Sequence, residues 1–223
     1  SFMKEHLPIL RRVGIVLIIV GLVDIAWMVW CITHDRSYSS SFNIFAVIAG
    51  ILLLRGGLKT AKYTRYFALF IFAALIGLDL VMPFMFPFGY WLAVFHQAPG
   101  TFFLDMMFSI IVTVFVFWVQ RSLGQASITE AQIAAGISPA TVKKPILIGA
   151  LLPIVLCGSL ILSFRGETAA KVIAHAKAEH GESYHYVIKN LRWSSNASGT
   201  RVSAIVEGYN STELKMFRIG WDE

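Results

Sequence analysis

The first 164 residues of the chain consist of long apolar runs separated by short polar segments. An α-helix of about 20 apolar residues is long enough to cross the hydrocarbon core of a bilayer. Runs of this kind cover residues 13–32, 41–58, 66–86, 101–119 and 145–164. The second run is interrupted by Arg55, whose long side chain would have to extend to the membrane surface. The pattern predicts an α-helical integral membrane bundle of five transmembrane helices within residues 3–164.

Residues 165–223 have a different pattern, typical of a small folded domain outside the membrane. Apolar residues recur at positions i, i+3, i+4 and i+7 from Ala169, which predicts an amphipathic helix that ends near His180. Strand-like runs follow at residues 184–193, 200–207 and 213–221. The order predicts an α+β domain, a helix followed by a three-stranded antiparallel meander. In layout it resembles the cystatin-like domains of membrane-bound accessory proteins.

The alternation of apolar and polar residues slips in the first of these runs. Tyr186 and Ile188 share one face, whereas Leu191 continues on the other, so we expect a β-bulge near Lys189 and Asn190. A domain of about 58 residues is near the lower limit for a self-sufficient core. We therefore expect the domain to pack against another part of the chain or against a partner.

An uncharged aromatic segment, residues 84–100, separates the third and fourth predicted spans. Pro83 and Pro87 at its start should kink or end the preceding helix. Aromatic side chains are enriched where membrane meets water. The segment is predicted to be interfacial or a partly re-entrant loop, and it is the part of the chain on which the small domain could lean if it does not lean on a partner.

The distribution of charge predicts the orientation of the chain in the membrane. The sequence is 57% hydrophobic and 14% charged, with a net charge of +6. Up to residue 164 the basic residues other than Arg36 lie in alternate loops, which indicates an N-terminus inside and residues 165–223 outside. We expect a multi-pass protein of the bacterial inner (plasma) membrane with a periplasmic C-terminal domain.

Nucleic-acid binding is not expected, because the positive charges follow the loops and do not form one basic face. The segment at residues 128–136 contains a capping-box spacing, Thr129 to Gln132, before Gly136. It is too short for a helix-turn-helix motif and is predicted to be a cytoplasmic linker helix.

Three aspartates lie within the predicted spans: Asp24, Asp79 and Asp105. A carboxylate in hydrocarbon is unfavourable unless it is neutralised, paired or hydrated, so each is a candidate functional residue. The predicted helix directions place all three in the outer half of the bilayer, which suggests a proton or cation site. The alternative is structural, because an aspartate can be hydrated near a helix end or can hydrogen-bond across a helix bundle.

The neighbours of these aspartates leave the chemistry open. His96 and His34 are candidate supporting ligands, and Arg36 is a candidate ion-pair partner at the interface. No metal-ligand spacing occurs, so the identity of any metal is unknown, and no cofactor is expected. Ser109 lies one turn from Asp105 on the same helix face, but no nucleophile motif surrounds it.

Three function classes are compatible with these patterns. The first is a non-enzymatic accessory or scaffold protein, anchored in the lipid bilayer, whose residues 165–223 engage a protein partner through an exposed strand edge. The second is a small proton- or cation-coupled transporter that uses the aspartates. The third is an intramembrane lipid-modifying enzyme. Assembly into a homo-oligomer is compatible with each of them.

Overall fold

The computed structural model describes residues 5–34, 43–164, 166–196 and 199–222. The elements are α1 (His6–Thr33), α2 (Asn43–Leu54), α3 (Leu58–Met85), α4 (Phe88–Gln97), α5 (Pro99–Leu123), α6 (Ala126–Ala134), α7 (Lys143–Ser163), α8 (Glu167–His180), β1 (His185–Asn196), β2 (Gly199–Tyr209) and β3 (Leu214–Asp222). They form two compact units. The first consists of Ser1–Leu75 with Ile111–Ala150, and the second of Ile76–Ile110 with Leu151–Glu223.

Within the described residues, four helices are long and apolar enough to cross a membrane: α1, α3, α5 and α7. Many of their large apolar side chains point outward, such as Leu80 and Phe108, which are 66% and 70% exposed. Water would oppose so much exposed apolar surface, whereas lipid chains cover it. The chain is therefore a multi-pass membrane protein.

The prediction of a fifth span at residues 41–58 is not confirmed. Residues 41 and 42 lie outside the described part of the chain, and α2 has only 12 residues. At about 1.5 Å per residue such a helix is about 18 Å long, shorter than the hydrocarbon core of about 30 Å. The helix ends before Arg55 and Gly56, and Gly56 has the positive φ of 77° that only glycine adopts readily.

The first unit is built on a close crossing of α1 and α2. A Cβ atom added to Gly50 would lie 2.6 Å from the carbonyl oxygen of Gly14, so the two backbones touch. Leu10, Val13 and Leu53 are fully buried around this crossing. Small residues of this kind allow helices in lipid to approach closely and to gain van der Waals contact.

Basic residues gather at one end of the first unit. The Arg12 guanidinium lies 5.8 Å from the centre of the Trp118 ring, which joins the start of α1 to the end of α5. The Arg65 guanidinium lies against Gly124. A helix is present at the predicted linker as α6, but it begins at Ala126 after Gln125, so the predicted capping box at Thr129 does not form. Its buried Gln132 instead donates a hydrogen bond of 3.1 Å from Nε2 to the Leu58 carbonyl oxygen at the start of α3.

The second unit contains the predicted meander. Its strands are antiparallel in the order β1-β2-β3, and α8 packs on one face over Ile188, Ala204, Val206 and Ile219. The predicted bulge is confirmed, because the β1–β2 register shifts between Ile188 and Asn190. Both the helix and the bulge follow from periodicity, since α8 needs one apolar stripe and each strand one apolar face.

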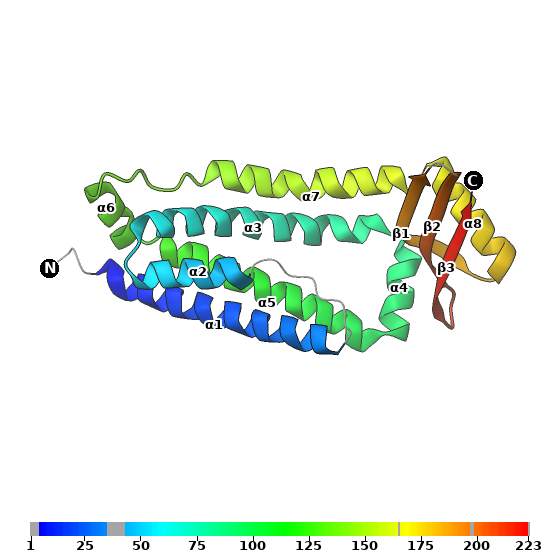
Figure 1. The fold of residues 1–223 in the computed structure, drawn as a ribbon, viewed down its shortest axis with the longest axis horizontal. Coiled ribbons are helices and arrows are strands. Elements are labelled where there is room, and N and C mark those ends of the chain that lie inside the picture. Colours follow the sequence, from blue (N-terminus) through cyan, green and yellow to red (C-terminus); the bar gives the residue numbers. More distant parts are fainter. Residues whose placement is uncertain (1–4, 35–42, 165, 197–198, 223) are drawn as a thin grey trace. The chain divides into compact units, whose positions relative to one another are not determined.

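The aromatic segment forms α4, a helix of 10 residues that covers the other face of the sheet (Figure 1). Tyr90 and Ala93 of α4 are buried against Val187 and Tyr209 of the strands. The expectation that the small domain leans on this segment is thus confirmed. The sheet is enclosed by α8 on one side and α4 on the other.

Candidate functional site

The contact between α4 and the sheet is held by three polar side chains, Tyr90, Lys189 and Glu207, which we call the Tyr90 clamp. The Tyr90 hydroxyl donates a hydrogen bond of 2.7 Å to Glu207 Oε2, and Lys189 Nζ donates one of 2.8 Å to the Tyr90 oxygen. Lys189 Nζ lies 3.5 Å from Glu207 Oε2, so the carboxylate and the ammonium neutralise each other. The Tyr90 oxygen, Lys189 Nζ and Glu207 Oε2 therefore each have a partner within the clamp.

Local structure explains why these residues meet. In β2 the side chains alternate, so that Val206 points to α8 while Glu207 and Tyr209 point to α4. Lys189 is the extra residue at the bulge of β1. A bulge redirects the side chain that it carries, and here that side chain points to α4. The helix α4 begins directly after Pro87, which presents Tyr90 in the first turn.

The electrostatics of the clamp favour a neutral tyrosine. Tyr90 is 4% exposed, and burial together with the Glu207 carboxylate raises the pKa of its hydroxyl above the usual value. Lys189 Nζ lies 4.5 Å and 4.8 Å from the centres of the Phe86 and Tyr90 rings, so the rings also attract the ammonium. The hydroxyl is a fixed hydrogen-bond donor and not a proton-transfer group at neutral pH.

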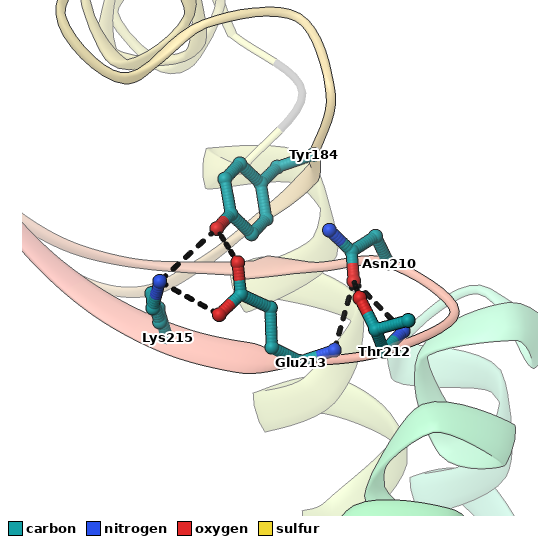
Figure 2. Close-up of polar contacts among 5 residues, drawn as sticks. All are labelled: Tyr184, Asn210, Thr212, Glu213 and Lys215. Carbon is teal, nitrogen blue, oxygen red and sulfur yellow. Dashed lines mark hydrogen bonds and ion pairs between the residues drawn. The ribbon is translucent and has the colours of Figure 1, made fainter.

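A second polar group closes the turn between β2 and β3 (Figure 2). Asn210 Oδ1 accepts hydrogen bonds from the backbone nitrogens of Thr212 and Glu213 at 2.9 Å and 2.8 Å. Beside it, the Tyr184 hydroxyl and Lys215 Nζ both contact the Glu213 carboxylate, Lys215 at 2.7 Å. Hydrogen bonds from Lys215 and then Tyr184 lower the pKa of Glu213, and the bond to Glu213 raises the pKa of Lys215.

Of the predicted aspartates, Asp79 has an interhelical partner in the structure. Ser109 Oγ donates to both Asp79 oxygens, at 2.9 Å and 3.1 Å, and so joins α3 to α5. Asp105 is exposed and lies four residues before Ser109, on the same face of α5. Asp24 is half-buried on α1, in the first unit. A single layer of three aspartates stays a prediction.

The supporting residues are scattered. His34 Nδ1 lies 2.9 Å from the Trp30 carbonyl oxygen at the end of α1, and its ring stacks on Trp30. His96 is exposed on α4, with its ring against Phe95. Arg36 lies outside the described residues. Among the residues that are described, no group of three or more His, Cys, Asp or Glu side chains is placed to hold a metal ion.

Sequence reasoning did not single out the Tyr90 clamp. Two signals pointed to its parts: the slip in alternation at Lys189, and the expectation that the domain leans on the aromatic segment. Neither identifies Glu207 as the partner of Tyr90, because 117 residues separate them.

The fold and these contacts define a multi-pass membrane protein whose C-terminal sheet domain is fastened to an aromatic helix between two apolar spans. Comparison of the chain with protein-family models, with curated proteins and with solved structures finds no match.

Proposed function

We propose that the chain is a membrane-anchored accessory protein whose C-terminal domain binds an extended segment of a protein partner along the free edge of β3. The observation that carries this proposal is the unbroken register of β3. Its nine residues pair with β2 from Leu214 to Asp222 without a bulge. Among the described residues no strand pairs with its other edge. Such an edge presents unpaired backbone groups to which another chain can add.

The two edges of the sheet differ in their suitability for strand addition. The bulge at Lys189 interrupts β1, and bulges protect an edge against pairing. In β3, Met216 is 64% exposed and supplies apolar surface for a partner. The helices on both faces keep the sheet rigid, which lowers the entropic cost of binding.

The backbone geometry indicates which β3 residues face outward. The Asn210 nitrogen donates to the Glu213 carbonyl oxygen, and hydrogen-bonded pairs alternate along an antiparallel ladder. Counting along the ladder from that bond, the backbone N–H and C=O groups of Lys215 and Phe217 should pair with β2. The backbone groups of Met216 should point to the open edge. A proline at position 216 therefore removes an outward donor without breaking the ladder.

The test uses a photo-crosslinking residue in place of Arg218, in the full chain in its native membrane. The proposal expects a covalent adduct with one protein of defined mass. The adduct should disappear in Met216→Pro and persist in Met216→Ala. An adduct unaffected by Met216→Pro, or no adduct at all, would contradict strand addition at β3.

We place the C-terminal domain on the extracytoplasmic side of a bacterial plasma membrane. The basic end of the first unit supports this orientation, because positive loop residues remain in the cytoplasm. A membrane-impermeant maleimide should label Ser183→Cys in intact cells and should not label Ala135→Cys on the α6 side. The reverse pattern would refute the orientation.

The second candidate is a proton or cation pathway, and the Asp79–Ser109 bond favours it. That bond brings Asp79 to the face of α5 that carries Asp105, so two carboxylates share one polar stripe. The chain reconstituted in proteoliposomes should then conduct protons or monovalent cations, and Asp79→Asn should abolish the flux. Wild-type chain without flux would remove this candidate and leave the accessory function untouched.

A further inference from the structure

The face of the sheet that packs on α4 is directed at the bilayer surface. Phe86 and Pro87 alone join α3 to α4, and Ala98 alone joins α4 to α5. The Trp91 indole also donates a hydrogen bond of 3.1 Å to the Pro83 carbonyl oxygen near the end of α3. These links hold α4 at the level where two membrane-spanning helices end. The sheet face that α4 covers is therefore turned toward the membrane.

Three arginines lie on this same face beyond the part that α4 covers: Arg192, Arg201 and Arg218. Residues directly opposite in register share a face, and alternate residues of a strand do so as well. Arg192 is opposite Ser203 and Arg218 is opposite Ile205. Arg201, Ser203, Ile205 and Glu207 alternate along β2, and Glu207 contacts α4. All three arginines are exposed, and the free face is cationic.

Arg192 and Arg218 differ from Arg201 in what lies opposite them in the sheet. Arg201 has the carboxyl residue Asp222 as its register partner. Neither Arg192 nor Arg218 takes part in an ion pair or hydrogen bond among the described side chains. By contrast, the opposite side of the domain has a mixed charge, since the exposed residues of α8 include Lys177 and Glu179. Unpaired positive charge is thus concentrated on the membrane-directed face.

The chemistry of these side chains matches a phosphate group. A guanidinium presents a planar fork of donors that binds phosphate oxygens in pairs, and it loses hydration more readily than an ammonium. Basic residues beside a bilayer are attracted to anionic headgroups. We propose that Arg192 and Arg218 bind the phosphates of anionic lipids in the leaflet next to the domain, and so fix the sheet on the membrane surface. This proposal rests on the membrane insertion of the helices and not on the binding of a protein partner.

The test compares the full chain in nanodiscs of phosphatidylcholine alone with discs that also contain phosphatidylglycerol. Amide hydrogen exchange in β1 and β3 should be slower in the anionic discs. The double variant Arg192→Gln/Arg218→Gln should lose this protection. The preference of the domain for the anionic over the neutral surface should fall about fivefold for each arginine removed. The matched control Lys177→Gln, on α8, should keep it.

Two further arms complete the test. Arg192→Lys/Arg218→Lys keeps the charge and should retain part of the protection, and equal melting of all variants in neutral discs shows that the domain is folded. Inorganic phosphate added to neutral discs should give no protection. Equal exchange in both kinds of disc would overturn the proposal. Equal loss of exchange protection in Lys177→Gln would also overturn the proposal, and so would protection by free phosphate. In either case the protection would not come from binding of the two arginines to anionic lipid headgroups.

Discussion

The Tyr90 hydroxyl on α4 donates a hydrogen bond of 2.7 Å to Glu207 Oε2 on β2, and this bond fastens the sheet to the aromatic helix of the same unit. Lys189 donates to the same hydroxyl, so Tyr90 is at once donor and acceptor. Removal of the tyrosine oxygen leaves both charged partners without their shared neighbour. The stability of the domain should therefore depend on one oxygen atom.

We expect Tyr90→Phe to destabilise the C-terminal domain by about 1.5–3 kcal/mol, the range for a hydrogen bond to a charged group. The ring contacts with Phe86 and Tyr209 remain, so the loss reports the hydroxyl. Denaturant unfolding of the full chain in detergent, followed by circular dichroism, measures it. Tyr63→Phe, at an exposed position of α3, is the matched control and should change little. Equal stability of the two variants would show that the clamp contributes nothing.

The raised pKa of Tyr90 predicts a loss of stability at alkaline pH. In the unfolded chain a tyrosine ionises near pH 10, whereas in the folded domain burial and Glu207 keep Tyr90 protonated to higher pH. Stability from this group is complete below the unfolded pKa and falls above it, by about 1.4 kcal/mol per pH unit. Unfolding measured at a series of pH values up to about 11 should show a steeper decline in wild type than in Tyr90→Phe. Parallel curves would assign the decline to other groups.

The β2–β3 turn should depend on the acceptor oxygen of Asn210. Asn210→Ala leaves the backbone nitrogens of Thr212 and Glu213 without their partner and should cost about 1–2 kcal/mol. Asn210→Asp keeps an oxygen at the same place and should retain most of the stability. Thermal melting of both variants checks this. If the aspartate variant were as unstable as the alanine variant, the turn would depend on the amide nitrogen.

The crossing of α1 and α2 should not tolerate a methyl group. Gly50→Ala would place Cβ 2.6 Å from the Gly14 carbonyl oxygen, so the helices must separate, at a cost of about 1–3 kcal/mol. Gly158→Ala in α7 is the control, because a Cβ there meets nothing within 4 Å. Melting of purified protein in detergent compares them. If Gly50→Ala had the same melting temperature as Gly158→Ala, the two helices would not be in close contact at this crossing.

The run at residues 41–58 shows what hydropathy does not determine. The apolar run at residues 41–58 has the composition of a span, but Arg55 and the glycines that follow end the helix at Leu54. A hydropathy value is an average over a window of residues, so it does not show the residue at which backbone geometry ends a helix. For the other four runs, α1, α3, α5 and α7 each cover the run to within one residue, and Pro83 and Pro153 lie inside their helices.

Periodicity alone determined the helix of residues 167–180, the meander and the bulge at Lys189, because each depends on the face to which successive side chains point. Apolar run length determined that the chain enters a membrane. Only the tertiary structure decided that Tyr90 meets Glu207 and that Ser109 meets Asp79, across 117 and 30 residues. The physical reason is that a side-chain hydrogen bond requires positions correct to a fraction of an ångström. Those positions are set by the packing of whole elements and not by local pattern.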